Sequence, residues 1–336
     1  MVNVGVIGLG MMGWTHLDIY AKRKDVKVVA VADADEDRLH GKTKAAGNIK
    51  GQAEGGFDLS WVKKYASAEE LINDPDVELV DVCLPTPLHR RFGEAALDAG
   101  KHLFIEKPLA RTYADAKALA DHAAKAGGKS MPGMCMRFWP GWPWLKEAIA
   151  DGRYGKLLSA HFRRVTSHPG GPFYTNGEAN GGALLDLHIH DADAVQWLCG
   201  MPQSVTAVGH SAVTGETDYA VTQYRYDGGP VVTAEGGWSF AAGFGFEMQY
   251  TANFEKATAK FDINAEHWLK VVEPGGEWKP VELPAGMGYE YEIDYLLKCI
   301  ADGRDPETVT LADAAESVRL IEAEARSVKT GQPVSL

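Results

Sequence analysis

The first thirteen residues place the strongest constraint on the fold of this chain. Residues 2–7 form an apolar run rich in valine, which is typical of a buried parallel strand. The run ends in a G-x-G-x-x-G pattern at Gly8, Gly10 and Gly13, and a helix is predicted over residues 14–22. The first glycine of such a turn permits the bend, the second lets a pyrophosphate approach the backbone, and the third lets helix and strand pack closely. The N–H groups that open the helix then favour a phosphate.

A second predicted strand, Val26–Ala32, ends at Asp33, at the spacing of roughly 20 residues that a dinucleotide site requires. A carboxylate at this place accepts hydrogen bonds from the ribose hydroxyls and repels a 2′-phosphate. Asp35 and Asp37 add to the repulsion. We therefore expect NAD in preference to NADP, with Met11 and Met12 of the turn beside the phosphates. The alternative is a glycine turn in an α/β domain that binds no ligand.

Composition sets wide bounds on the class of protein. A length of 336 residues allows two domains, and 45% hydrophobic with 24% charged residues is typical of a globular protein. No apolar run approaches the roughly 18 residues of a membrane span, and no signal peptide is recognised at the N-terminus. The net charge of −12 argues against nucleic acid as a partner. Four scattered cysteines without a C-x-x-C pair suit reduced thiols, so we expect a cytoplasmic protein.

Strands and helices alternate through the first part of the chain. Strands are predicted at 77–84, 102–105 and 130–136, and helices at 90–99 and 113–126, with Ser67 capping a shorter one. The long polar stretch 33–70 is expected to hold helix fragments and a mobile excursion. This alternation predicts a doubly wound parallel sheet, in which ligands bind beyond the carboxyl ends of the strands. The candidates there are Pro85, Thr86, His89, Glu106 and Lys107.

A Trp/Pro cluster at 139–144 is interpreted as a crossing between domains, and the pattern then changes to alternating segments. Alternation favours an antiparallel sheet with two unlike faces. Helices are predicted at 288–301 and 311–329, the second with Thr308 or Thr310 as its cap. We expect domains over residues 1–125 and 126–336. The alternating segments are 156–167, 204–213, 219–226, 231–238, 246–254, 258–263 and 268–272.

Two clusters carry groups that could act in chemistry. In the first, Pro108 favours an extended Lys107, which would direct its ammonium over the cofactor site; an ordinary surface lysine is the alternative. In the second, a helix is predicted to continue through residues 181–198, which would place Asp186 and His190 on one face. A histidine beside a carboxylate suits proton transfer from a hydroxyl, although a solvated helix face or a core histidine explains the same pattern.

A metal site is the remaining interpretation of the second cluster. His188, His190 and Asp191 are all suitable ligands. On a helix, however, residues two apart point in nearly opposite directions, so a shared ion would require a non-helical segment. We therefore predict that no metal is bound.

With these motifs placed, the sequence resembles the Gfo/Idh/MocA oxidoreductases, the relatives of glucose–fructose oxidoreductase and inositol dehydrogenase. The resemblance covers nearly the whole chain, and its motifs are specific for the family and only weakly specific for a substrate. It is carried by the motifs at residues 6–13, 82–89, 99–109, 181–191 and 330–334.

The resemblance implies an α/β Rossmann dinucleotide-binding domain followed by an α+β domain with a large, open, mostly antiparallel sheet. Subunits of the family often associate through this sheet, which implies a homo-oligomer, a dimer or a tetramer. The implied activity is NAD(P)-dependent oxidation or reduction of a sugar, glycoside or cyclitol. By the family pattern, Lys107 contacts substrate and nicotinamide ribose, Asp186 assists, and His190 is the general acid and base.

The chain departs from the family pattern at two places. Leu84-Pro85-Thr86 stands where relatives commonly have Thr-Pro-Asn. His188 stands where they often have glycine, so this second imidazole is a further candidate either for substrate contact or for tuning His190. The aromatic candidates suit the apolar side of a sugar ring, with packing at the domain junction as the alternative for each tryptophan. The other candidate substrate contacts are Arg137, Trp139, Trp142, His161, Arg163, His168 and Tyr174.

Two rival functions remain open at this point. Some relatives use bound cofactor for a transient oxidation within a net elimination, hydrolysis or isomerisation. The other rival is a sensor that binds a dinucleotide or sugar without catalysis. The retention of Lys107, Asp186 and His190 argues against the sensor.

Overall fold

The computed structural model describes residues 1–42 and 56–336. The chain groups into two compact units, one of residues 1–134 with 289–316, the other of residues 135–288 with 317–336. This division differs from the boundary predicted after residue 125. Residues 130–133 add a sixth strand to the first sheet, and a helix near the C-terminus groups with the first unit.

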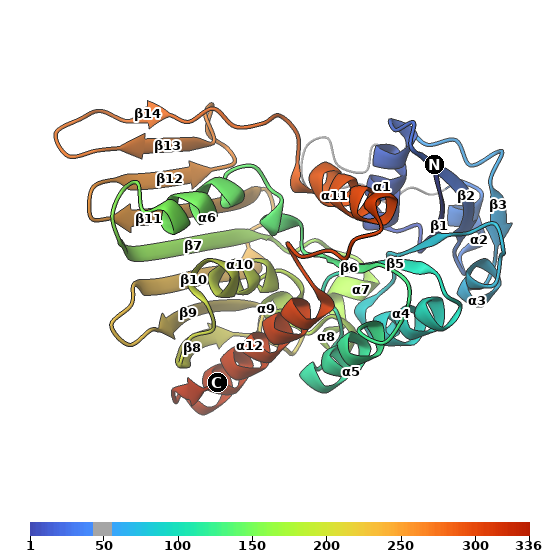
Figure 1. Cartoon of the computed structure of the whole chain (residues 1–336). Coiled ribbons are helices and arrows are strands. Elements are labelled where there is room, and N and C mark those ends of the chain that lie inside the picture. The colour runs from blue at the N-terminus through green and yellow to red at the C-terminus, as the bar shows by residue number, and fades with distance from the viewer. Residues whose placement is uncertain (43–55) are drawn as a thin grey trace. The chain divides into compact units, whose positions relative to one another are not determined.

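The sheet of the first unit is entirely parallel in its six strands, in the order β3-β2-β1-β4-β5-β6 (Figure 1). The order reverses between β1 and β4, and ligands of such sheets bind at this switch point. Side chains at its centre, including Val6, Val80 and Ile105, are fully buried. The strands are β1 (Val2–Ile7), β2 (Val26–Ala32), β3 (Lys63–Tyr65), β4 (Leu79–Val82), β5 (His102–Glu106) and β6 (Ser130–Gly133).

Helices alternate with these strands, as the sequence predicted. The hydroxyl of Ser67 accepts the N–H of Glu70 and so caps α3, as expected. The helices are α1 (Met11–Ala21), α2 (Glu36–Leu39), α3 (Ala68–Ile72), the 3-10 turn η1 (Thr86–Leu88), α4 (His89–Asp98), α5 (Tyr113–Ala123) and α11 (Gly288–Asp302).

The stretch 33–70 is where prediction and structure differ most in this unit. The strand β3 was missed because Lys63-Lys64-Tyr65 lies at the sheet edge and lacks the apolar character of the inner strands. The excursion predicted within this stretch stays a prediction, because residues 43–55 lie outside the described residues. The helix after the glycine turn begins at Met11, earlier than predicted.

The second unit is built on nine strands in the order β14-β13-β12-β11-β7-β10-β9-β8-β15. Its neighbouring strands are antiparallel, apart from the parallel pair β7 and β10. The two-residue strands β14 and β15 were not predicted. The strands are β7 (Leu157–Ser167), β8 (Ser204–His210), β9 (Tyr219–Arg225), β10 (Val231–Phe240), β11 (Phe246–Phe254), β12 (Thr258–Asp262), β13 (Leu269–Val272), β14 (Lys279–Pro280) and β15 (Val334–Ser335).

The two faces of this sheet differ as the alternation predicted. Ala220, Thr222 and Tyr224 on β9 are buried, whereas Val208 and Val231 on the opposite face are 66% and 59% exposed. The helices α6 and α10 lie over the buried face (Figure 1). The helical segments are η2 (Cys135–Arg137), α6 (Trp142–Asp151), α7 (Pro172–Thr175), α8 (Gly177–Asn180), α9 (Gly182–Asp186), α10 (Ile189–Cys199) and α12 (Leu311–Thr330), of which α12 joins this unit from Ser317 onward.

Within the described residues, no helix is both long enough and apolar enough to cross a membrane.

Candidate functional site

The glycine turn after β1 has the geometry that a phosphate cradle needs. Gly8 has a φ of +94°, and a Cβ placed on it would lie 2.5 Å from the carbonyl oxygen of Cys83. A Cβ on Gly13 would lie 1.9 Å from the carbonyl oxygen of Gly8. Gly10, by contrast, has no described atom within 4 Å of such a Cβ. The turn therefore requires glycine at residues 8 and 13 to form, and at Gly10 it leaves its backbone open to a ligand.

Asp33 lies against this turn at the end of β2. Its Oδ2 accepts the N–H of Leu9 at 2.7 Å, and its Oδ1 accepts the N–H of Asp35 at 2.8 Å. The side chain is partly exposed, and each carboxylate oxygen keeps a second lone pair. Asp33 can therefore hold the turn and still accept a hydrogen bond from a ribose hydroxyl.

His89 joins the loops that follow β4 and β5. Its Nδ1 lies 2.7 Å from the carbonyl oxygen of Pro108 and its Nε2 lies 2.6 Å from that of Leu84. Burial lowers the pKa of His89, and a neutral ring donates to one of these carbonyls at a time. The ring is 1% exposed, so His89, predicted to bind cofactor, supports the loops that carry Pro85 and Lys107 instead.

The end of β5 places Glu106 inward, and Lys107 follows it at the surface of its unit. Oε2 of Glu106 accepts the N–H of Lys107 at 3.0 Å, and its carboxylate is nearly buried. Lys107 is partly exposed, and its peptide bond to Pro108 is cis. Glu106, a predicted cofactor contact, therefore fixes the backbone of the lysine.

A buried polar cluster that sequence reasoning missed lies beside Glu106. Nδ1 of His16 is 2.9 Å from Oδ2 of Asp81, which also accepts the hydroxyl of Tyr20 at 2.8 Å. Glu292, on α11, is fully buried, and among the described residues neither carboxylate oxygen has a hydrogen-bond partner. Burial, with the nearby Glu106 charge, raises the pKa of Glu292 well above its ordinary value. The sequence signals were a histidine in the helix after the glycine turn and an aspartate, Asp81, within an apolar strand.

Two sets of donors in this cluster lie close enough together to hold an ion, His16 with Asp81 and Cys83, and His16 with Glu106 and Glu292. Metal ligands must be deprotonated. Burial raises the pKa of the Cys83 thiol, and burial with the nearby Glu106 charge raises that of Glu292, so each set contains a group that must give up a proton before it can bind an ion. The absence of a resident metal stays a prediction.

In the second unit, the helix predicted over residues 181–198 is broken. The N–H groups of Leu187 and His188 both point to the carbonyl oxygen of Ala183, at 2.9 and 2.8 Å, and α10 begins only at Ile189. Asp186 and His190, both partly exposed, therefore lie on successive helices, and their placement on one face stays a prediction. The glycines before the segment and its apolar spacing gave no signal of this break.

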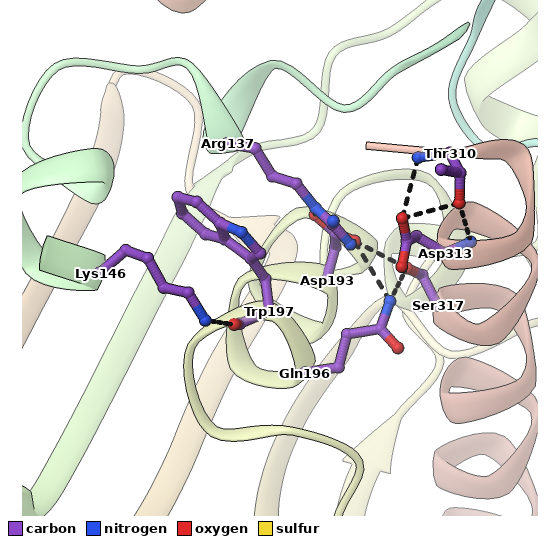
Figure 2. A network of polar contacts seen from close by, with 8 residues as sticks. All are labelled: Arg137, Lys146, Asp193, Gln196, Trp197, Thr310, Asp313 and Ser317. Atoms are coloured by element: carbon purple, nitrogen blue, oxygen red, sulfur yellow. Dashed lines mark hydrogen bonds and ion pairs between the residues drawn. The ribbon is translucent and has the colours of Figure 1, made fainter. Parts of the chain in front are cut away.

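Arg137 belongs to a polar network that fixes α10 (Figure 2). Its guanidinium donates to both carboxylate oxygens of Asp193, at 2.7 and 3.0 Å, and Ser317 donates to the same carboxylate at 2.9 Å. Arg137 is 5% exposed. It was predicted to contact the substrate, but in the structure it forms an ion pair within its own unit instead. Figure 2 also shows the predicted cap of α12, where the Thr310 hydroxyl accepts the N–H of Asp313 at 3.1 Å.

Trp139 and Trp142 pack in the interior and are 1% and 0% exposed. The Trp142 ring meets Tyr250 and Phe261 edge-on. The interpretation of these two tryptophans as substrate contacts is therefore wrong, and packing explains the Trp/Pro cluster.

His161 and Arg163 lie on the sheet face opposite α10. Side chains alternate along β7, and Arg164, which follows Arg163 and lies on the other face, forms a buried ion pair with Asp191 of α10, at 2.8 Å. Arg163 instead pairs with Glu235 and Glu247. This alternation separates these two predicted substrate contacts from His190 by the thickness of the sheet.

His168 and Tyr174 remain candidates, because both are partly exposed and pack edge-on against Trp238. His188, by contrast, is fully buried and lies 3.1 Å from a carboxylate oxygen of Glu324. Its interpretation as a substrate contact is therefore wrong.

Comparison with known proteins agrees with this architecture. Residues 2–134 match the family model described as oxidoreductase family, NAD-binding Rossmann fold, and residues 142–260 match the GFO/IDH/MocA C-terminal domain. A myo-inositol 2-dehydrogenase of Thermotoga maritima is 33% identical over 68% of this chain and 66% of its own length. A scyllo-inositol 2-dehydrogenase (NAD(+)) of Bacillus subtilis is 24% identical over 100% of this chain and 96% of its own.

Solved structures agree on the fold. A levoglucosan dehydrogenase in complex with NADH and levoglucosan superposes with a TM-score of 0.85, covering 99% of each chain at 22% identity. The fold, both domain matches and the aligned relatives lead to one conclusion: the chain belongs to the Gfo/Idh/MocA family of oxidoreductases and carries its NAD-binding Rossmann fold.

Proposed function

We propose that this protein is an NAD-dependent dehydrogenase that transfers a hydride between nicotinamide and a hydroxyl-bearing or keto carbon of a sugar, glycoside or cyclitol. The observation that carries the cofactor part is the glycine turn, which only glycine at residues 8 and 13 can form and which leaves Gly10 open. The inositol and levoglucosan dehydrogenases among its relatives support the substrate class. NAD is preferred to NADP because the carboxylate of Asp33 borders the turn.

The proposed chemistry assigns one task to each of three side chains. When bound, nicotinamide accepts or donates the hydride at its ring. His190 takes the proton of the substrate hydroxyl during oxidation and returns it during reduction. Lys107 stabilises the developing alkoxide with its ammonium, and Asp186 assists the histidine. General base catalysis of this kind contributes roughly 10²–10⁴-fold to the rate.

The binding residues follow from the same proposal. Backbone N–H groups at residues 9–13 would face the pyrophosphate, with Met11 and Met12 at the start of α1 beside it. Pro85 and Thr86, which follow β4, are assigned to the nicotinamide side, as are Glu106, the last residue of β5, and Lys107 directly after it. His168 and Tyr174 are the proposed aromatic contacts of the substrate.

The experiment that tests this function combines purified protein, NAD⁺ and a panel of inositols, sugars and levoglucosan. NADH absorbance and substrate loss are followed together. An increase in NADH absorbance with one class of compound is expected. Substrate loss without net NADH would instead identify the transient-oxidation chemistry. Tight NAD⁺ binding with neither signal would contradict the dehydrogenase.

We further propose that the chain forms a homo-oligomer, a dimer or a tetramer, through the exposed face of the nine-stranded sheet. Val208 and Val231 on this face are 66% and 59% exposed, more than is usual for valine within a sheet. Light scattering on the wild type and on a Val208→Lys, Val231→Lys variant tests the assignment. A smaller particle is expected for the variant, and an unchanged mass would contradict it.

A further inference from the structure

His188 is embedded in the second unit by a charged hydrogen-bond network. Its side chain is fully buried, and its Nε2 lies 3.1 Å from Oε2 of Glu324 on α12. Glu324 is also fully buried and accepts the hydroxyl of Tyr224 at 2.8 Å and that of Thr222 at 2.9 Å, both from β9. Three donors thus converge on one carboxylate, which is how a buried charge is retained.

The space for the His188 ring exists because β10 has glycine at residue 236. A Cβ on Gly236 would lie 2.3 Å from Nδ1 of His188 and 2.8 Å from its Cβ. The ring therefore packs directly on the backbone of β10 while its other nitrogen reaches Glu324. The ring is thus constrained by packing on β10, by Glu324 on α12 and by the hydroxyl of Tyr224 on β9, which lies 3.3 Å from its Nε2.

The residue so fixed lies at the break between α9 and α10. The N–H of His188 points to the carbonyl oxygen of Ala183 at 2.8 Å, and its own carbonyl accepts the N–H groups of Asp191 and Ala192, each at 3.0 Å. His188 is thus the residue directly before α10, and His190 is the second residue of that helix. The buried ion pair of Asp191 with Arg164 holds the same turn on β7.

We propose that His188, through Glu324, is a positioning residue that holds the first turn of α10 and with it the ring of His190. The inference rests on the proposed function, in which His190 carries the proton. His188 itself touches no substrate in this scheme. Its contribution is to prevent the turn from shifting, because a misplacement of about 1 Å at a reacting group can lower turnover about 100-fold.

The test compares variants that disturb the contacts of His188 with Glu324 and Gly236 with one variant that keeps the hydrogen bond to Glu324. His188→Leu removes the donor to Glu324, Gly236→Ala displaces the ring without altering any charge, and His188→Gln retains an N–H donor of similar reach. Leu269→Ala, in the fully buried core of β13, is the matched control for a general loss of stability. The readouts are turnover with NAD⁺ and myo-inositol or levoglucosan, NADH affinity by fluorescence, and the ring NMR signals of His190.

We expect H188L and G236A to lower kcat about 10- to 100-fold with unchanged NADH affinity, and to shift or broaden the His190 signals. H188Q should stay within about fivefold of the wild type, because it keeps the hydrogen bond to Glu324 and loses less than one hydrogen bond of ordinary strength contributes. L269A should leave the His190 signals unchanged. If H188L leaves both kcat and the His190 signals as in the wild type, or if L269A alters them equally, the positioning role is overturned. Full turnover in H190A would overturn the proposed function instead, because that result does not depend on His188.

Discussion

Nε2 of His16 lies 3.3 Å from Oε1 of Glu106, so the helix that follows the glycine turn is tied to the residue that precedes Lys107. The two segments are far apart in sequence and belong to different motifs. Their contact explains how a phosphate cradle and a proposed catalytic lysine are held by one buried cluster. Glu292 of α11 extends that cluster.

Glu292→Gln should remove a pH dependence of stability. The folded pKa of Glu292 is raised by burial and by Glu106, so the folded state keeps a proton that the unfolded state loses above about pH 4.5. Wild-type stability should therefore fall as pH rises through the folded pKa, by up to about 1.4 kcal/mol per pH unit. The neutral glutamine should flatten this slope. Urea unfolding from pH 5 to 9 measures it, and equal slopes in both proteins would refute the protonated state.

Gly10→Ala should weaken NADH binding without unfolding the protein, whereas Gly13→Ala should lower its stability. Alanine at residue 10 meets no described atom within 4 Å, so unfolding free energy should change by less than about 1 kcal/mol while the Kd for NADH rises at least tenfold. Alanine at residue 13 would clash with the carbonyl oxygen of Gly8, 1.9 Å away, and should destabilise the unit. Thermal unfolding and NADH fluorescence titration measure both. Unchanged NADH affinity in G10A would remove the turn from the cofactor site.

Asp33→Ala should reduce the preference of the protein for NADH over NADPH. Removing the carboxylate abolishes repulsion of a 2′-phosphate and the hydrogen bond to a ribose hydroxyl. We expect NADH to bind about tenfold more weakly and NADPH to bind as well or better. Asp37→Ala, an exposed acidic neighbour, is the control and should change both affinities less. An identical NADH to NADPH ratio in wild type and D33A would contradict the assignment.

Asp218 should anchor the loop before β9. Its carboxylate accepts the N–H groups of Ala212, Val213 and Thr214 and the indole N–H of Trp238. Burial alone would raise the pKa of Asp218, but these donors lower it to about 2. The contribution of the ionised Asp218 carboxylate to the free energy of unfolding is present above pH 4 and is lost as pH falls toward 2.

Asp218→Asn should therefore lower the free energy of unfolding by about 2 kcal/mol at pH 7, because an amide cannot accept all of these donors. Asp227→Asn, at a largely exposed carboxylate near the end of β9, is the control and should change it by less than about 0.5 kcal/mol. Urea unfolding at pH 7 measures both, and equal effects of the two substitutions would show that the donors contribute nothing.

Local patterns in the sequence predicted most of the fold and only part of the site. The parallel sheet, the two-faced second sheet and the caps at Ser67 and Thr310 follow from periodicity and capping chemistry, which act between neighbours in sequence. The break before α10 was not predicted, because local spacing carries no signal of it, and the contacts of His188 with Glu324 and Gly236 are made only in the fold. For the same reason, Arg137 and Trp142 were interpreted as substrate contacts although their partners lie in the core.

The most direct test of the account is the effect of His190→Ala on NADH formation. Wild type and variant are mixed with NAD⁺ and the inositol or levoglucosan that the wild type oxidises, and NADH affinity is titrated in parallel. The account predicts a fall in turnover of roughly 10²–10⁴-fold with NADH affinity unchanged, because the histidine moves the proton while the glycine turn binds the cofactor. Turnover equal to the wild type at the same NADH affinity would contradict the assignment of His190 as the acid and base.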